Sequence, residues 1–369
     1  MLTQAHAHKA AFCTQFLALL LFLSGTLLSH SADFVVSNMT QLASSMGSLK
    51  PGDSLVLATG KWANVDLLFK GKGTPAAPIY LRAQVLGKVF LTGSSRLRIS
   101  GRYLVVDGLV FSGGTQTDDH LIAFRESSTI LATNCRVSNC VITNYPPAIA
   151  GQDTKWVSLF GYSNRVDHCY FAGKTNPGTL LVVWLPDNAP QTPNYHLIDH
   201  NRFGPRPPLG ENGAETIRVG DSSRSFNISH TIVEANLFQD CNGEVEIISN
   251  KSCENVYRGN TFIDCEGALT LRHGNRCTVE GNFFFGHNKP NTGGVRIIGE
   301  DHKVFNNYFA DLSGTGTRSA LTFMLALTNS PLNGYFQVKR AVVAFNTFVN
   351  CAASLRIGVA TTYDETGEV

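Results

Sequence analysis

The chain has 369 residues, of which 43% are hydrophobic and 16% are charged, and it contains 34 glycines. This composition is typical of a folded, β-rich protein and excludes a disordered chain or a long coiled coil. The 30 lysines and arginines nearly balance the 28 aspartates and glutamates, which argues against a protein that coats nucleic acid or an anionic membrane. A polyanion would bind only where basic groups are concentrated locally.

Residues 1–31 are predicted to be a signal peptide. Lys9 precedes an apolar run over residues 16–28, and small residues, among them Ser31, follow that run. The run is short for a membrane span, so a transmembrane anchor is the less favoured alternative. Cleavage near Ser31 would release an exported protein, periplasmic or extracellular, without membrane attachment.

Residues 32–369 are predicted to form one domain, and its irregular first part, residues 32–80, is predicted to be an N-terminal cap. Within the cap, residues 49–57 are expected to form a turn that leads into the first regular segment. A repetitive domain needs such a cap because its first unit has no neighbour on one side.

A short phrase, Asn-x-Phe, recurs along the chain, and its tightest spacings are 24, 22 and 25 residues. Its copies begin at Asn201, Asn236, Asn260, Asn282, Asn307 and Asn346. Short runs of β-branched and apolar residues lie between the copies, and none of them has a helical apolar period. The sequence therefore predicts an all-β, single-stranded parallel β-helix, a solenoid with one coil per repeat. The Asn side chains are expected to hydrogen-bond along the stack, and the Phe side chains are expected to stack inside it.

Four cysteines also follow the repeat. Cys241, Cys253, Cys265 and Cys277 are spaced by twelve residues, about half of one coil. This spacing favours small buried residues stacked in the core. Disulfides, which export would permit, or metal binding are the alternatives.

Residues at equal offsets from the recurring Asn are expected to lie above one another on neighbouring coils. This overlay predicts that Arg218 lies beneath Ile248, and that Ile248 lies beneath Arg272. Two arginines would then flank the coil that contains residues 244–251.

Alternation along that strand predicts that Glu244 and Glu246 point outward together, about 7 Å apart. Carboxylates this close repel each other unless a cation lies between them. Asn212 and Lys251 are expected to reach the same face. An ordinary solvated charged face is the alternative interpretation.

At these residues the sequence resembles polysaccharide lyase family six, the alginate lyases and chondroitinase B-like enzymes. The resemblance covers roughly residues 34–355, and the matching phrases are residues 212–218, 244–252, 254–260 and 271–274. It implies a right-handed parallel β-helix, in agreement with the repeat. It also implies an acidic, uronate-containing polysaccharide as substrate.

Carried over position by position, the resemblance implies that Asn212, Glu244 and Glu246 bind Ca²⁺, a hard cation that prefers oxygen ligands. It implies that Lys251 is the catalytic base and that Arg272 protonates the leaving group or stabilises its charge. A lysine can accept a proton where neighbouring positive charge disfavours its ammonium form. Further candidates for binding substrate carboxylates are Arg218, Arg258, His273 and Arg296, and candidates for supporting the site from behind are Glu215 and Glu234.

The expected activity is β-elimination from alginate, with a chondroitin or dermatan sulfate lyase as the nearest alternative. A glycan-binding β-helix without activity would not need Lys251 and Arg272 together. A glycoside hydrolase would use Glu244 and Glu246 as its carboxylate pair and would not need calcium. The family usually continues with further coils, so the polar end of this chain predicts either a truncation or an exposed last coil. The oligomeric state is left open.

Overall fold

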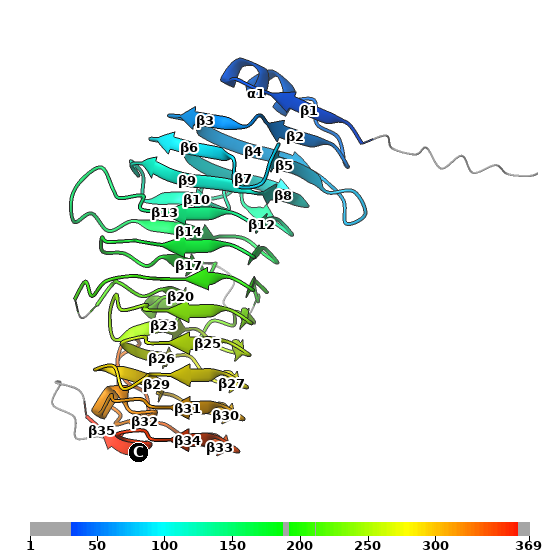
Figure 1. Cartoon of the computed structure of the whole chain (residues 1–369). Coiled ribbons are helices and arrows are strands. Elements are labelled where there is room, and N and C mark those ends of the chain that lie inside the picture. Colours follow the sequence, from blue (N-terminus) through cyan, green and yellow to red (C-terminus); the bar gives the residue numbers. More distant parts are fainter. Residues whose placement is uncertain (1–30, 187–191, 211, 361–369) are drawn as a thin grey trace, which may run out of the picture. The chain divides into compact units, whose positions relative to one another are not determined.

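The computed structural model describes residues 31–186, 192–210 and 212–360. Over these residues the backbone winds into a stack of coils, and each regular coil contributes a strand to each of three parallel sheets (Figure 1). The predicted right-handed parallel β-helix is confirmed. The expected signal peptide, apart from Ser31, and the polar tail after residue 360 lie outside the described residues.

The strands are assigned to three sheets, named sheet 1, sheet 2 and sheet 3. Sheet 1 comprises β1 (Asp33–Val36), β2 (Ser54–Leu57), β5 (Ile79–Ala83), β8 (Leu104–Asp107), β12 (Arg136–Ser138), β15 (Arg165–Asp167), β18 (Leu197–Asp199), β21 (Ile232–Glu234), β24 (Val256–Arg258), β27 (Thr278–Glu280), β30 (Lys303–Phe305) and β33 (Val342–Ala344). Sheet 2 comprises β4 (Asp66–Lys72), β7 (Arg96–Arg102), β10 (His120–Ala123), β11 (Ala132–Thr133), β14 (Lys155–Leu159), β17 (Leu181–Val183), β20 (Ile217–Gly220), β23 (Glu246–Lys251), β26 (Gly267–His273), β29 (Thr292–Ile297), β32 (Leu321–Met324) and β35 (Leu355–Val359). Sheet 3 comprises β3 (Gly60–Ala63), β6 (Val89–Gly93), β9 (Leu109–Gly114), β13 (Val141–Thr143), β16 (Tyr170–Ala172), β19 (Arg202–Phe203), β22 (Leu237–Gln239), β25 (Thr261–Ile263), β28 (Phe283–Phe285), β31 (Tyr308–Ala310) and β34 (Thr347–Val349).

The region expected to cap the stack contains a helix that the sequence interpretation missed. Helix α1 (Met39–Met46) begins after Asn38, whose side-chain oxygen accepts a hydrogen bond from the backbone N–H of Gln41 at 3.0 Å. Leu42 is its one fully buried residue, and Figure 1 shows the helix at the blue end of the stack, next to β1. The expected turn before β2 is present at residues 51–52. Two short 3₁₀ helices, η1 (Ser222–Arg224) and η2 (Gly316–Arg318), lie in loops further along.

The recurring Asn residues form the predicted ladder. From Asn236 onward, the side-chain oxygen of each Asn accepts two hydrogen bonds of 2.9–3.0 Å, one from the backbone N–H and one from the amide nitrogen of the Asn on the preceding coil. The residue before each Asn has a positive φ, as at Ala235, where φ is 52°. The ladder therefore satisfies buried polar groups at a sharp corner between sheets 1 and 3.

The recurring Phe residues stack inside the coils, also as predicted. Ring centroids of neighbours lie 4.5–5.2 Å apart along the series Phe171, Phe203, Phe238, Phe262, Phe284, Phe309 and Phe348. Cysteines occupy the core in the same manner: the backbone N–H of Cys241 points at the sulfur of Cys265, 3.5 Å away. Cys253 and Cys277 are buried as well, and the eight cysteines among the described residues are free thiols. The stacked-core interpretation is therefore confirmed.

A second polar ladder follows the other end of the sheet 1 strands. There, the backbone N–H of Cys277 donates to Nδ1 of His302 at 3.2 Å, and Nε2 of His302 bonds the carbonyl of Ile298 at 2.9 Å. His302 is fully buried. Its two ring nitrogens therefore fit one neutral tautomer.

The last described coil, formed by β33, β34 and β35, leaves apolar side chains exposed, including Phe345, which is 85% exposed. No helix among the described residues has both the length and the hydropathy that a membrane span requires.

Candidate functional site

The candidate site lies on sheet 2, where β20, β23 and β26 are neighbours. Here the predicted overlay was wrong: Arg218 pairs with Ser249 rather than with Ile248, and Ile248 pairs with Leu269, three positions before Arg272. Two irregularities in the pairing of β23 with β26 shift the register. Arg272 lies at the second irregularity, so it has no paired residue on β23. An extra residue at a bulge changes which side chains share a face. Equal sequence offsets therefore do not give equal heights on this sheet.

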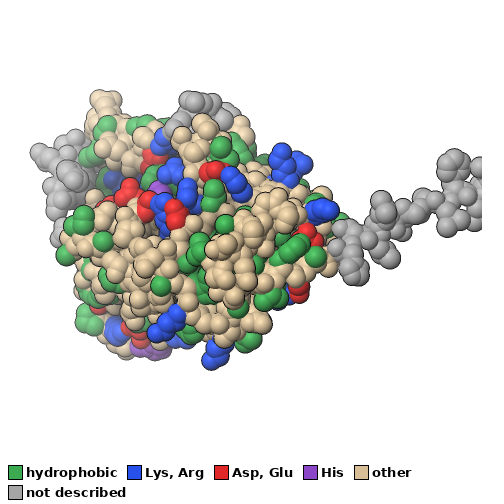
Figure 2. Space-filling model, turned by 90° about the horizontal axis from the view of Figure 1, so that it is seen from above, with side chains coloured by type: hydrophobic (Ala, Val, Ile, Leu, Met, Phe, Trp, Pro, Cys, Tyr) green, Lys and Arg blue, Asp and Glu red, His purple; other side chains and the backbone are tan. Residues whose placement is uncertain are grey.

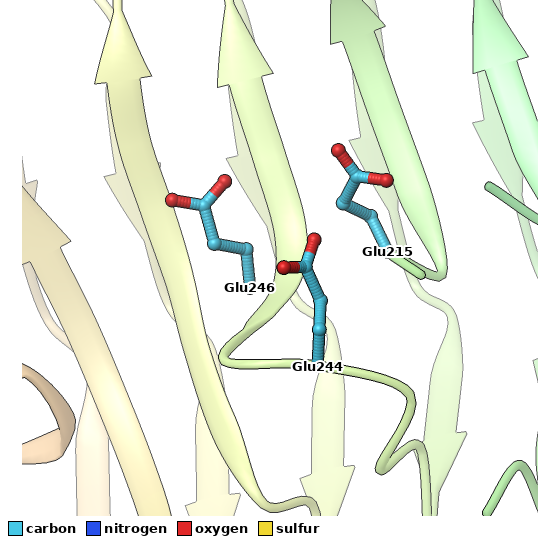
Figure 3. Close-up of side chains that lie close together, drawn as sticks. All are labelled: Glu215, Glu244 and Glu246. Atoms are coloured by element: carbon cyan, nitrogen blue, oxygen red, sulfur yellow. The ribbon is translucent and has the colours of Figure 1, made fainter. Parts of the chain in front are cut away.

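Three glutamates come together at the start of these strands. Each of Glu215, Glu244 and Glu246 offers a carboxylate oxygen, and these oxygens all lie within 4.8 Å of one another. Figure 3 shows the three side chains projecting from the same side of neighbouring segments. Glu246 is the first residue of β23, whereas Glu215 and Glu244 lie just before β20 and β23. All three are buried, with at most 7% of each residue exposed.

The sequence analysis placed Glu215 behind the site, but the structure places it within the carboxylate group. The hydroxyl of Thr179 donates to Glu215 at 2.7 Å, and Nζ of Lys251 lies 3.7 Å from the same carboxylate. Burial opposes ionisation of Glu215, but the positive charges of Lys251 and Arg218 outweigh burial and lower the pKa of this carboxyl group. Glu215 is therefore a buried anion.

Glu244 has the opposite electrostatic environment. Burial, together with the negative charges of Glu215 and Glu246, raises the pKa of Glu244 to about 9. Its Oε1 atom is buried without a hydrogen-bond partner among the described residues. A buried carboxyl group with an unpartnered oxygen beside two further carboxylates is a donor set that fits a hard divalent cation. These residues are thus suited to hold Ca²⁺, with the expected Glu244 and Glu246 joined by Glu215.

Glu246 is held by cationic and hydroxyl groups. The guanidinium of Arg296, which is only 4% exposed, and the hydroxyl of Ser249 both bond its carboxylate, and Nε of Arg272 lies 4.0 Å away. Arg296 was a candidate for binding substrate, with a purely structural role as the equal alternative. It is buried against Glu246 and positions that carboxylate, which agrees with the structural alternative.

Arg272 is oriented by a loop from further along the chain. Its guanidinium donates to the carbonyls of Gly334 at 2.9 Å and Asn333 at 3.2 Å, and it lies 3.9 Å from the ring centroid of Tyr335. A separate contact, from the hydroxyl of Ser225 to the carbonyl of Leu332 at 3.0 Å, fastens this loop to the segment after β20. Arg272 therefore has a fixed direction and lies at the same site as Glu246.

His273 is adjacent to these cations and is not charged. Burial and the charges of Arg272 and Lys251 lower its pKa to about 2, and its Nε2 atom lies 3.1 Å from the hydroxyl of Ser222. A neutral imidazole can serve as a hydrogen-bonding group beside the site.

The remaining predicted residues lie at different distances from the three glutamates, and two of them lie on another sheet. Arg218 lies on sheet 2, with its guanidinium 5.3 Å from the centroid of Trp184. Asn212 is exposed in the loop before Glu215. Arg258 and Glu234 lie on β24 and β21 of sheet 1, where they pair with each other, so they are on a different sheet from the glutamates.

Lys251 ends β23, opposite Gly220 on the preceding coil. Its side chain is 15% exposed. A Cβ atom on Gly220 would come within 2.5 Å of the Lys251 carbonyl oxygen, so glycine permits the close approach of the two coils at this position. The arrangement places a lysine amine, an oriented guanidinium and a group of carboxylates on one sheet.

Comparison with known proteins places this chain in a family. The family profile described as Chondroitinase B matches residues 36–368. A family-six alginate lyase, AlyGC, is 46% identical over 84% of this chain, with a TM-score of 0.82; this chain spans only 42% of the length of that structure. A mannuronic acid specific family-six lyase from human gut microbiota is 37% identical, with a TM-score of 0.82 and coverage of 91% of this chain and 77% of that one.

A further family-six alginate lyase, solved in complex with a trisaccharide, is 27% identical, with a TM-score of 0.73 and coverage of 87% of this chain and 72% of that one. No curated protein sequence matches the chain. The profile match over residues 36–368 and the 37% identity with a family-six lyase agree with the sequence resemblance and with the β-helix. The chain belongs to polysaccharide lyase family six, the chondroitinase B-like family.

Proposed function

We propose that the protein is a calcium-dependent lyase that cleaves alginate by β-elimination and leaves unsaturated uronate ends. One observation carries this proposal: three buried carboxylates, Lys251 and Arg272 lie together on one sheet, and Lys251 and Arg272 each contact one of the carboxylates. Family membership supports the reaction class, and the alginate lyases among the relatives support the polymer.

Lys251 and Arg272 would act at different steps of the elimination. Lys251 would accept the carbon-bound proton next to the uronate carboxylate, a double bond would form, and the glycosidic carbon–oxygen bond would break. Arg272 would stabilise the negative charge that develops on the departing oxygen; as a proton donor it is poor, because arginine holds its proton tightly. Ca²⁺, held by the glutamates and, as the resemblance implies, Asn212, would supply Lewis-acid stabilisation at the substrate carboxylate.

The test is ultraviolet absorbance during incubation of the protein with alginate, with and without a calcium chelator. The proposal expects a rise, from the new conjugated double bond, that the chelator abolishes. Lys251→Ala should abolish the rise, whereas Lys303→Ala, on the exposed side of sheet 1, should leave it unchanged. A chelator-insensitive rise would remove calcium from the proposal, and activity retained by Lys251→Ala would remove the proposed base.

A second candidate is cleavage of chondroitin or dermatan sulfate by the same residues, favoured by the Chondroitinase B profile. A rise on dermatan sulfate but not on alginate would select it. Absence of any rise on both polymers, with binding retained, would select a glycan-binding protein without activity.

We also propose that the protein is exported. The proposal rests on the apolar run over residues 16–28 and its flanking residues. N-terminal sequencing of the mature protein tests it: a start near residue 32 is expected, and a protein that retains residue 1 in the cytoplasm would contradict it.

A further inference from the structure

A line of side chains leads along sheet 2 to Lys251 from the coils that precede it. Strand pairing places Leu159 opposite Val183 and Val183 opposite Val219, so the next residues, Phe160, Trp184 and Gly220, also lie in line. Gly220 in turn lies opposite Lys251. Neighbouring coils are about 4.8 Å apart, so Trp184 and Phe160 are two and three coils from Lys251, about 10 and 14 Å away.

The same line continues to Arg125. Ala123 pairs with Ser158, so Arg125 lies on the coil before Phe160 at the same position, four coils from Lys251. Its guanidinium lies 3.8 Å from the centroid of the Phe160 ring.

Two arginines enclose the aromatic pair. The Phe160 and Trp184 rings are parallel, with an interplanar angle of 2° and centroids 5.7 Å apart. Arg125 covers Phe160 on one side, and Arg218 lies over Trp184 on the other. The two rings therefore hold two guanidinium groups three coils apart, about 14 Å.

Neither guanidinium has a carboxylate within salt-bridge distance among the described residues. Arg125 instead meets Nε2 of His120 at 3.2 Å. By contrast, Arg96 and Arg98, on the neighbouring strand, are both paired with Asp66. An arginine that is stacked on a ring and has no carboxylate within salt-bridge distance retains its capacity to bind an anion bidentately.

A cavity borders this line. It has a volume of about 460 Å³, and its lining includes Arg125, Phe160, Trp184 and Tyr162. A second cavity of about 240 Å³ shares Arg125 and continues past it to Arg96 and Arg98. Seen from the α1 end, the surface has basic and acidic side chains gathered together over one part (Figure 2). Two cavities that share Arg125 in their linings therefore border the part of the line from Arg125 to Trp184.

We propose that this line is a remote subsite for the polyuronate chain, in which Arg125 binds a uronate carboxylate several sugar units from the bond that is cleaved. The polymer would lie along the stack of coils, over the edges of Phe160 and Trp184, because the coil spacing is close to the length of one pyranose unit. Arg218 would bind a carboxylate nearer to Lys251. This inference rests on the proposed function, and it predicts a preference for long substrates.

The test compares polymer with trisaccharide in Arg125→Ala. The ratio of kcat/KM for polymer to that for trisaccharide should fall about tenfold, the effect of losing one charge-assisted hydrogen bond. Arg125→Gln is a second variant that retains side-chain length. The matched control is Arg202→Ala: Arg202 also lies over a ring, that of Tyr170 at 5.4 Å, but on sheet 3.

Binding is measured separately through tryptophan fluorescence. Of the three tryptophans, Trp62 and Trp156 are buried and Trp184 lines the cavity. In a Lys251→Ala background, alginate oligomers should change the emission, and adding Arg125→Ala should raise their Kd about tenfold. Polymer-to-trisaccharide ratios and Kd values equal to those of Arg202→Ala would refute the subsite. A complete lack of turnover by the unaltered protein would instead refute the lyase proposal, and the fluorescence titration would still decide the subsite.

Discussion

The Asn ladder makes a quantitative prediction about stability. Asn260 is fully buried, and its side-chain oxygen accepts the backbone N–H of Asn236 and one N–H of the Asn236 amide, both at 3.0 Å. Asn260→Ala would leave both donors buried without an acceptor. A buried donor that loses its partner costs about 1 to 3 kcal/mol, so the free energy of unfolding should fall by about 2 to 6 kcal/mol.

Asn346 provides the matched control because its oxygen accepts the equivalent two bonds from Asn307, at 3.0 and 2.9 Å, while Asn346 is only half-buried. Water can replace its oxygen there, so Asn346→Ala should cost about 1 kcal/mol or less. The assay is urea unfolding followed by circular dichroism, with midpoints compared for both variants and the unaltered protein. Equal losses at the two positions, or less than about 1 kcal/mol at Asn260, would refute the reasoning that burial makes the ladder stabilising.

Three further predictions concern the site and the core. Glu244→Gln should remove the rise in Tm that Ca²⁺ gives the unaltered protein. Without Ca²⁺, the same substitution should raise the Tm because one crowded carboxyl group is gone. Calorimetric scans with and without chelator measure both changes in Tm. Arg206 is buried and donates to four carbonyls, two of which belong to residues 214 and 215, so it positions the segment that contains Glu215. Arg206→Lys should therefore weaken Ca²⁺ binding measured by isothermal titration. An unchanged Kd would contradict this positioning role. Burial lowers the pKa of His302 from 6.5 to about 4, and between these values the unfolded chain binds a proton that the folded chain does not. The free energy of unfolding should therefore fall by up to about 3 kcal/mol as pH decreases through this range. In His302→Gln, the midpoint of urea unfolding should depend less on pH over the same range.

The repeat was sufficient to predict the fold because the same contacts return on every coil. The Asn and Phe stacks were predicted from six copies of a three-residue phrase, and both are present. Short parallel strands with a common turn leave few alternatives for such a period. Helix α1 was missed because it lies before the repeats, where Asn38 and a single buried leucine are the only signals.

The site was harder to predict because it depends on local irregularities. The bulges in β23 and β26 displaced the overlay, and Glu215 precedes its strand, so alternation says nothing about where its side chain points. Arg258 was assigned to the site because the sequence phrase is continuous there, although the chain has by then turned onto sheet 1. The line from Arg125 to Lys251 joins residues far apart in the sequence. Only the strand register, with its inserted loops, brings them into line.

The loop that holds Arg272 ties the assembly of the site to the order in which the chain is synthesised. The glutamates and Lys251 have all been made once residue 251 is synthesised, and Arg296, which positions Glu246, follows 45 residues later. The carbonyls that orient Arg272 belong to residues 333 and 334, more than sixty positions later. A growing chain would therefore complete the residues proposed to hold Ca²⁺ before the loop that orients Arg272, and the proposed cleavage would require the later coils to have folded.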